Sequence, residues 1–453
     1  MAETVDVVVL GMGPGGEDLA ERTAEAGLEV VGIDAGLVGG ECPYWGCVPS
    51  KMMIRAANLL AEGRRIPGMA GSSTVTPDWA PVATRIRAEA TDDWDDRVAV
   101  ERFEGKGGRF VRGRGRLDGP TRVVVDDRVF EARRAIVVNT GTRAFVPPVD
   151  GLAGTPFWTN REAIETEEVP TSLVVLGGGA IGAELGQVFA RFGATVSVVE
   201  GADRLLPPEE PEAGRLIAEV FAREGIAVHT SARVTAVRHD GGLFEVETED
   251  GGPVAGQRLL VATGRRVDLA AIGAATIGVS ELKRALPVDD HLRVCDGVWA
   301  VGDITGHGAF THVSMYQADI VVAQLLGRPV TPADYRAVPR VTFTDPEIGS
   351  VGLSEADARD AGIAVRTGSA PVSSSSRGWI HKAGNDGFVK LVEDADRGVL
   401  VGATSAGPVG GEVLGLLTLA VHEAVPTERL RHMIYAYPTF HRGILDALSD
   451  LSQ

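Results

Sequence analysis

The residues best suited to chemistry are two cysteines, Cys42 and Cys47, which are followed directly by a helical pattern with Pro49 at its start. Thiols this close can form a disulfide where the backbone between them curls. A proline fits the first turn of a helix, so Cys47 is expected near the positive end of that helix, which favours its thiolate.

A structural disulfide or two buried thiols are the alternatives to a redox pair. A chain of 453 residues with one further cysteine has little need of a staple, so we interpret the pair as redox-active. The spacing between the cysteines is not a usual zinc pattern, and no second pair exists. The sequence therefore predicts no metal site.

Length and charge bound the possible functions. A chain of 453 residues predicts two to four domains, and a net charge of −18 argues against binding nucleic acid or an anionic membrane surface. No apolar run reaches transmembrane length, and the N-terminal residues lack a basic region and a cleavage site. We therefore expect a cytoplasmic protein in a reducing compartment.

A dinucleotide-binding pattern opens the chain. Residues 5–10 have the composition of a buried parallel strand, a helical pattern follows, and a second strand at 29–33 ends in Asp34. The turn between strand and helix has the spacing G-x-G-x-x-G, at Gly11, Gly13 and Gly16. This arrangement predicts a βαβ unit in which the helix N-terminus receives a pyrophosphate and the acid binds a ribose hydroxyl.

The same pattern occurs a second time. A strand at 173–176, a helix at 181–192 and a strand at 195–199 surround it, and the acid at its end is Glu200. Its glycines are Gly177, Gly179 and Gly182. Both copies keep every glycine and the acid, so two dinucleotides are expected rather than one dead copy. A carboxylate at Glu200 repels a 2′-phosphate, which favours NADH over NADPH, although Arg204 would suit that phosphate.

Three further strand-to-turn crossings are expected to face a long ligand, because a glycine there lets the backbone approach it. They are Thr140-Gly141, Thr263-Gly264 and Gly302-Asp303. Residues 61–115 are expected to be mixed helix and loop. Residues 331–453 lack a glycine fingerprint and predict a separate α+β domain with an apolar interface.

In order along the chain, these motifs resemble those of the flavoprotein disulfide reductases, the family of dihydrolipoamide dehydrogenase, glutathione reductase and mercuric reductase. The resemblance runs essentially end to end and includes Cys42-x4-Cys47-Val-Pro-Ser-Lys51 and the motif Val-Thr-Phe-Thr-Asp-Pro-Glu at 341–347. It implies an α/β fold with two Rossmann-like dinucleotide-binding domains and a C-terminal α+β dimerisation domain. The expected bounds are 1–150 and 270–330 for FAD, 151–269 for NAD(P) and 331–453 for dimerisation.

The resemblance also implies roles for single residues. Cys42 and Cys47 are the redox pair, Lys51 and Glu184 lie beside the flavin, and a homodimer completes each active site with the partner's C-terminal domain. The FAD-binding residues implied are Gly11, Gly13, Gly16, Asp34, Lys51, Gly115, Thr140, Gly141, Asp303, Thr311 and His312. The NAD-binding residues implied are Gly177, Gly179, Gly182, Glu200 and Gly264.

The chain departs from the family near its C-terminus. The family pattern is His-Pro-Thr with a carboxylate one turn later, whereas here Tyr437 precedes Pro438 and Arg442 replaces the carboxylate. Free tyrosine has a pKa near ~10 and is a poor base at neutral pH. Tyr437 is therefore expected either to donate a hydrogen bond or to line the pocket, and His441 is expected to be structural.

The expected function is an NADH-dependent flavoenzyme that passes electrons through FAD and the Cys42–Cys47 disulfide to a specialised small-molecule disulfide or other electrophile. The lost histidine disfavours ordinary dihydrolipoamide or glutathione turnover. Two alternatives stay open: a diaphorase or quinone reductase in which the flavin reduces the acceptor directly, and a member with carboxylase-type chemistry. A non-enzymatic flavin-binding module explains the thiol pair poorly.

Overall fold

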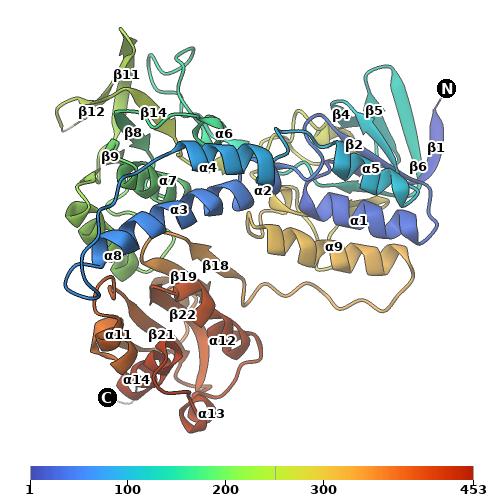
Figure 1. The fold of residues 1–453 in the computed structure, drawn as a ribbon. Helices are drawn as coiled ribbons and strands as arrows, with labels where there is room; N and C mark the ends of the chain where they lie inside the picture. Colours follow the sequence, from blue (N-terminus) through green and yellow to red (C-terminus); the bar gives the residue numbers. More distant parts are fainter. Residues whose placement is uncertain (1, 250, 452–453) are drawn as a thin grey trace. The chain divides into compact units, whose positions relative to one another are not determined.

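The computed structural model describes residues 2–249 and 251–451. The chain forms two compact units. The first combines Met1–Ser50, Thr84–Phe145 and Arg265–Tyr335, and the second combines Lys51–Ala83, Val146–Gly264 and Arg336–Gln453. Figure 1 colours both units along the sequence, and each is described by itself.

The first unit is built on an eight-stranded sheet with the strand order β16-β17-β6-β1-β2-β3, to which β5 and β4 are added. β1 (Glu3–Leu10) is parallel to both β2 and β6, and β16 runs antiparallel at the edge. The other strands are β2 (Val30–Asp34), β3 (Arg109–Arg112), β4 (Gly115–Leu117), β5 (Arg122–Val125), β6 (Arg128–Val138), β16 (Arg293–Cys295) and β17 (Val298–Ala300). A two-stranded sheet pairs β7 (Arg143–Ala144) with β15 (Arg265–Arg266).

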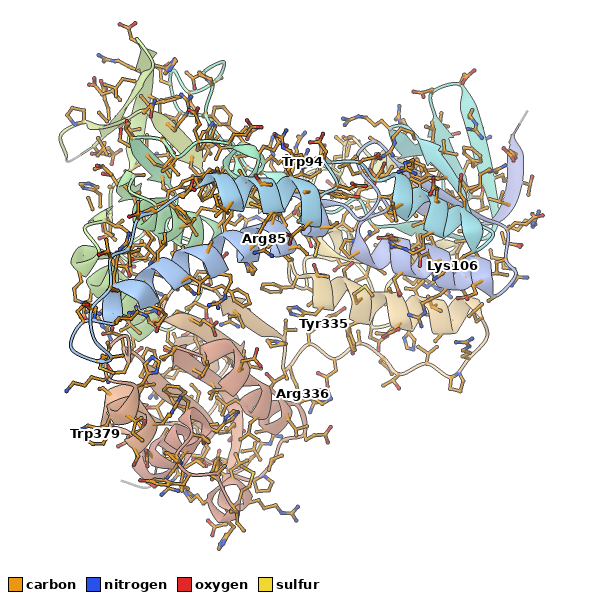
Figure 2. All side chains as sticks on the ribbon, in the orientation of Figure 1. Arg85, Trp94, Lys106, Tyr335, Arg336 and Trp379 are labelled. Atoms are coloured by element: carbon orange, nitrogen blue, oxygen red, sulfur yellow. The ribbon has the colours of Figure 1, made fainter. Side chains whose placement is uncertain are left out.

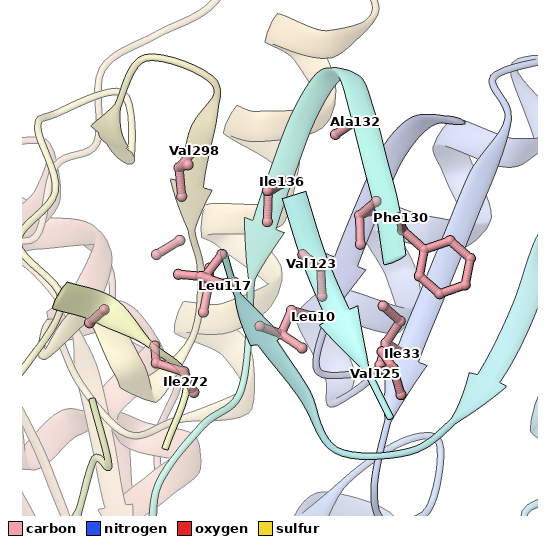
Figure 3. Packing of buried hydrophobic residues seen from close by; sticks show 14 of the residues in the cluster. Leu10, Ile33, Leu117, Val123, Val125, Phe130, Ala132, Ile136, Ile272 and Val298 are labelled. Atoms are coloured by element: carbon pink, nitrogen blue, oxygen red, sulfur yellow. The ribbon is translucent and has the colours of Figure 1, made fainter. Parts of the chain in front are cut away.

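Strand β1 is buried on both faces, as expected for a central parallel strand. Val7 and Val9 pack toward α1 (Pro14–Glu25) and α9 (Thr311–Leu325), which lie side by side in Figure 1. Val8 and Leu10 point to the opposite face, where Figure 3 shows Leu10 among the side chains of β4, β5 and β6. Packing on both faces holds β1 in place. The turn that begins at Gly11 is therefore held at the carboxyl end of this strand.

Several short elements complete this unit. α2 (Glu41–Tyr44) precedes α3 (Cys47–Arg65), whose first turn belongs to the first unit and whose remainder belongs to the second. The others are a π-helical turn at Ile86–Ala90, α5 (Arg97–Gly105), and 3₁₀ turns at Ala274–Ile277 and Asp303–Thr305.

The second unit contains another parallel sheet, with the strand order β10-β9-β8-β14. α7 (Ala180–Arg191) follows β8 and packs on the sheet. The strands are β8 (Ser172–Leu176), β9 (Thr195–Val199), β10 (Ala227–His229) and β14 (Arg258–Val261), and the other helices are α6 (Asn160–Glu165) and α8 (Pro211–Arg223). α4 (Ala80–Arg85) begins in this unit, and its residues from Thr84 on belong to the first unit. An antiparallel sheet of β11 (Val234–Asp240), β12 (Leu243–Thr248) and β13 (Val254–Gly256) lies in the same segment.

The C-terminal part of the second unit is an antiparallel five-stranded sheet with the order β18-β19-β22-β21-β20. Helices α12 and α14 pack on it, and Trp379 of α11 is 72% exposed (Figure 2). The strands are β18 (Pro339–Thr342), β19 (Glu347–Gly352), β20 (Val365–Pro371), β21 (Phe388–Asp394) and β22 (Val399–Gly407). The helical elements are α10 (Glu355–Asp360), a 3₁₀ turn at Val372–Ser374, α11 (Ser376–His381), α12 (Gly410–His422), α13 (Thr427–His432), a 3₁₀ turn at Phe440–Arg442 and α14 (Gly443–Asp450).

This architecture confirms the predicted α/β fold with two Rossmann-like sheets and a C-terminal α+β part. The expectation of only helix and loop over residues 61–115 is wrong in one respect, because β3 lies in that range and β4 begins at its last residue. β3 is a four-residue edge strand with an exposed Arg112, so its sequence carries little strand signal.

Across the part of the chain that the structure describes, none of the helices is long and apolar enough to cross a membrane.

Candidate active site

The first glycine-rich turn depends on a close approach of two backbone segments. Gly11 has a φ of +100°, and a Cβ there would collide with the carbonyl group of Asn139, at the end of β6. A Cβ on Gly16 would collide with the carbonyl oxygen of Gly11, whereas Gly13 meets only the Asn139 side-chain amide, at 3.2 Å. The glycines thus let the turn close at the start of α1, where a pyrophosphate is expected.

The carboxylate of Asp34 holds this turn. Its Oδ2 accepts a hydrogen bond from the Met12 N–H at 2.7 Å, and its Oδ1 accepts one from the Gly36 N–H at 2.7 Å. Burial raises the pKa of the Asp34 carboxyl, against the two N–H groups, which lower it. A carboxylate has about four acceptor positions, so capacity for a ribose hydroxyl remains.

The second turn repeats this construction. Gly177 has a φ of +104°, and a Cβ there would collide with the carbonyl of Ala262. Glu200 accepts from the Gly178 N–H at 2.6 Å and from the Ala202 N–H at 2.7 Å. In both units the carboxylate accepts one hydrogen bond from the N–H of the residue that follows the first glycine. It accepts a second from the N–H of the residue two positions after the acid. The residues present therefore suit a dinucleotide in each.

Cys42 lies in α2 and Cys47 begins α3, and both are reduced cysteines. Cys47 is the first residue of α3, and its Sγ is 3.5 Å from the Thr311 hydroxyl. The hydrogen bond to Cys47 is the main cause that raises the pKa of the Cys42 thiol, and burial adds to it. The structure thus brings together Cys42, Cys47 and Thr311, three of the residues singled out in the sequence.

The aromatic residue after Cys42 and Pro43 is buried rather than open to a pocket. Tyr44 packs with its ring centroid 5.8 Å from that of Trp45. Burial, with Asp96 and Glu17 nearby, raises the pKa of Tyr44 to about 12. Tyr44 therefore supports α2 from the interior.

Two other predicted flavin residues of the first unit, Asp303 and His312, are held by neighbouring side chains. Thr142 donates to the Asp303 carboxylate at 2.8 Å and accepts from Arg265 Nε at 2.8 Å. His312 stacks on Phe310, with ring centroids 5.1 Å apart. These contacts leave Asp303 anchored beside the turn at Gly302.

Lys51 and Glu184 form an ion pair in the second unit, with Nζ 2.8 Å from Oε2. Glu184 also accepts from the Phe343 N–H at 2.7 Å, and the Lys51 ammonium lies 4.6 Å from the centre of the Phe343 ring. The side chain of Glu184 is only 7% exposed and that of Lys51 is 35% exposed. The ion pair is therefore restrained by the backbone and the ring of Phe343, and it differs from an exposed surface ion pair.

Tyr437 belongs to the second unit, and 69% of it is exposed. The Arg442 guanidinium lies over its ring at 5.7 Å. His441 is exposed in the 3₁₀ turn. The two residues in place of the family dyad thus stack on each other.

Other predicted site residues have structural explanations as well. Gly115 is buried, and a Cβ there would collide with Leu10, so core packing alone requires glycine. Gly141 and Gly264 have φ values of +62° and +117°, with no atom within 4 Å of an added Cβ. Their cofactor contacts remain predictions, as do those of Thr140, Gly179 and Gly182.

The sequence analysis missed three residues that support the site. Asn139 donates its side-chain amide to the Gly11 carbonyl at 3.3 Å, and Gln317, which is fully buried, accepts from the Gly302 N–H at 2.6 Å. Phe343 holds the Lys51–Glu184 pair. Asn139 directly precedes Thr140-Gly141 and Phe343 lies inside the family motif at 341–347, so both had a signal in the sequence.

The structure also brings Asp289, Asp290 and His291 together, with ligand atoms within 4.8 Å of one another. The two acids are exposed, and His291 Nδ1 is 2.6 Å from Asp290. Exposed acids commonly cluster in turns, so we assign no metal to them.

Comparison with known proteins identifies the family. The model of the pyridine nucleotide-disulphide oxidoreductases matches residues 5–318, and that of their dimerisation domain matches residues 338–448. The chain belongs to this family. The predicted resemblance is therefore confirmed, and the chain is an NAD(P)H-dependent flavoprotein oxidoreductase that acts on a sulfur group.

Relatives in this family match nearly the whole chain. A dihydrolipoyl dehydrogenase from Haloferax volcanii is 32% identical over 99% of this chain and 96% of its own length. A mercuric reductase from Streptomyces lividans is 32% identical over 97% of this chain and 94% of its own length.

Solved structures of the family have the same fold. The HOCl-induced flavoprotein disulfide reductase RclA from Escherichia coli superposes with a TM-score of 0.85 at 26% identity and covers 98% of this chain and 99% of its own. LpdA from Mycobacterium tuberculosis has a TM-score of 0.85 at 26% identity over 99% of both chains. Members of this oxidoreductase family are FAD-dependent and use a pyridine nucleotide.

The glycine turn predicts a contrast between two substitutions. Gly11→Ala should lower both FAD content and the thermal midpoint, because its Cβ meets backbone and its positive φ costs about 1–3 kcal/mol. Gly13→Ala is the matched control: its φ of −68° suits alanine, so the apoprotein should unfold near the wild-type midpoint. Flavin absorbance and thermal scans measure both. A Gly11→Ala protein with wild-type flavin content and midpoint would contradict the account of the turn.

The thiol pair predicts a pH dependence. The raised pKa of Cys42 lowers its thiolate fraction, so in NADH-reduced enzyme its alkylation by iodoacetamide should be slower than that of N-acetylcysteine below about pH 8.5. Cys47→Ala removes the largest cause and should shift the Cys42 profile to lower pH. Peptide mass spectrometry measures the rates. Identical profiles in the two proteins would show that the thiol–thiol hydrogen bond is unimportant.

Proposed function

We propose that the chain is an NADH:disulfide oxidoreductase that delivers electrons through Cys42 and Cys47 to a specialised small-molecule disulfide or other electrophile. The observation that carries this proposal is the thiol pair, in which Cys42 of α2 is hydrogen-bonded to Cys47, the first residue of α3. In the cytoplasmic, reducing compartment proposed for this chain, such a pair is expected to be redox-active rather than a structural disulfide.

The two cofactors are assigned to the two glycine-rich turns. The first turn, with Asp34, Thr142 and Asp303, supports an FAD site in the first unit. Bound FAD would supply the two-electron transfer between NADH and the thiol pair. The second turn supports the nicotinamide nucleotide.

NADH is favoured by the surroundings of Glu200 and Arg204. The carboxylate of Glu200 stands at the end of β9, where it would repel a 2′-phosphate. Arg204 is 3.0 Å from the Asp203 carboxylate and donates to the Pro207 carbonyl at 2.9 Å, so its guanidinium is already engaged.

The thiol pair performs the exchange with the acceptor. The Cys42 thiolate attacks one sulfur of the acceptor disulfide, which breaks the S–S bond and releases one thiolate that takes a proton. Cys47 then attacks the Cys42 sulfur, closes the Cys42–Cys47 disulfide and releases the second thiol. The pair loses two electrons and two protons, the acceptor gains both, and NADH restores the dithiol.

Lys51 supplies a fixed positive charge. Its ion pair with Glu184 and its position over the Phe343 ring restrict it, so the charge needs no reorganisation when electron density builds up on a neighbouring flavin. This role rests on the family resemblance and on the rigidity of the pair.

The active chain is proposed to be a homodimer. The matched dimerisation domain supports this, and the resemblance would then bring the partner's Tyr437 toward Cys42. A tyrosine in place of histidine, together with the raised pKa of Cys42, leaves the exchange without an efficient base at neutral pH. An acceptor with an acidic thiol as leaving group suits such a site, because it needs little help from a proton donor.

The lack of an efficient base also favours a second candidate, a diaphorase or quinone reductase in which the flavin reduces the acceptor directly. Carboxylase-type chemistry is a third candidate within the family, since it too benefits from a missing proton donor.

Cys42→Ser separates the first two candidates. If the thiol pair carries the electrons, NADH-driven disulfide reduction should fall by about 10³-fold or more, whereas quinone reduction should stay within about twofold. Cys295→Ser, a change of the third cysteine, is the control. Disulfide reduction that survives in Cys42→Ser would exclude the first candidate.

Tyr437→His tests the missing base. Lipoamide reduction at neutral pH should rise at least about tenfold, because a positioned general base contributes about 10²–10⁴-fold. Tyr437→Phe removes the hydroxyl without adding a base and serves as the control. If neither variant changes the rate or its pH profile, Tyr437 takes no part in the exchange.

A further inference from the structure

The C-terminal domain contains a polar pocket of about 200 Å³. One wall is the serine-rich segment that ends in Ser376 and Arg377, and the other is formed by Tyr437, Thr439, Arg442 and Asp446. Neither the serine run nor the two arginines has a place in the mechanism described above. All of these residues belong to the second unit.

Among the described residues, neither of the two arginines pairs with a carboxylate, and each instead lies over an aromatic ring. Arg377 lies over the Phe440 ring at 5.4 Å and Arg442 over the Tyr437 ring at 5.7 Å. Arginines of the same domain that do form ion pairs are Arg340, Arg359, Arg366, Arg397 and Arg431. A guanidinium that contacts a ring through its face retains its N–H donors for a planar anion.

The hydroxyl groups of the pocket divide into two sets. Ser374, Ser375 and Thr439 donate to the backbone carbonyls of Pro371, Val372 and Ala436, so they fix the walls. Within the described residues, the Ser376 and Tyr437 hydroxyls make no hydrogen bond, and both residues are exposed. Four donor groups therefore face a ligand: two guanidinium groups and two hydroxyls.

We propose that this pocket binds a carboxylate group of the electron acceptor, which makes the substrate class a low-molecular-weight disulfide that carries carboxylates. The inference rests on the proposed function, because Tyr437 occupies the position that would meet the partner's Cys42. Two arginines suit a carboxylate, which accepts two parallel hydrogen bonds from one guanidinium. Asp446 lines the same pocket and would reject a second negative charge close to it.

Three disulfides of equal arm length test the charge preference. The probes are 3,3′-dithiodipropionate, bis(2-hydroxyethyl) disulfide and cystamine, which carry two negative charges, none and two positive charges. The holoenzyme with NADH should show kcat/KM highest for the dianion and lowest for cystamine, with a preference for the dianion over the neutral probe that weakens as salt is raised. Equal values for the dianion and cystamine would overturn the proposal.

Arginine variants assign the preference to the pocket. In Arg377→Gln and Arg442→Gln, the ratio of kcat/KM for the dianion to that for the neutral disulfide should fall by roughly tenfold to a hundredfold, the effect of a lost charge-assisted hydrogen bond. Arg429→Gln is the matched control, because Arg429 is an exposed arginine of the same domain outside the pocket. An equal fall of the ratio in Arg429→Gln would show that only net charge matters.

A measurement without turnover keeps this inference separate from the proposed function. Phenylglyoxal modifies arginine, and 3,3′-dithiodipropionate should slow the modification of Arg377 and Arg442 but not of Arg429, as mapped by peptide mass spectrometry. If this protection is seen although none of the three disulfides is reduced, the anion site stands and the disulfide reductase function fails. If Arg377 and Arg442 are not protected, the anion site is wrong whatever the enzyme reduces.

Discussion

The structure depends on one local constraint, which is repeated in both units. A glycine lies so close to the end of a neighbouring strand that no Cβ would fit, and a carboxylate accepts hydrogen bonds from the turn that this glycine begins. Asp34 holds the turn at Gly11, and Glu200 holds the turn at Gly177 in the same way. Each acid is thus fixed by backbone N–H groups before a ribose reaches it. A preformed turn spares a bound dinucleotide part of the entropic cost of ordering its site. Both proposed cofactor sites are built on this repeated contact.

The thiol pair shows how burial and hydrogen bonding limit the chemistry that those cofactors supply. Cys42 shares a hydrogen bond with Cys47, and the bond that keeps the pair together also keeps Cys42 protonated. A family member with a histidine opposite this thiol can remove that proton, whereas tyrosine is a weak base. The acceptor that we propose therefore has its own reactivity, as a disulfide with acidic thiols does. In this proposal, loss of the base narrows the substrate range and leaves the electron path in place.

The sequence predicted the parts of the fold that depend on local rules. Glycine spacing and the continuous apolar run of β1 are readable from neighbours in the chain, and so is the start of a helix at Cys47. Contacts between distant segments were not readable. Asn139 reaches Gly11 across 128 positions, and the pocket joins Arg377 to Arg442 through tertiary packing. β3 was not predicted, because a segment of four residues with arginine at both ends gives almost no strand signal.

An acidic protein with an anion pocket needs a physical explanation. The net charge of −18 is spread over the whole chain, and charges separated by more than about 8–10 Å are largely screened at physiological salt. The field in the pocket is therefore set by the charged residues that line it, which are two arginines and Asp446. Those three leave one net positive charge, and a carboxylate that displaces no existing ion pair can bind there. The overall negative charge therefore slows the approach of an anion more than it destabilises the bound anion. Raised salt should speed the approach by screening this repulsion, while it weakens the contact between the anion and the two arginines.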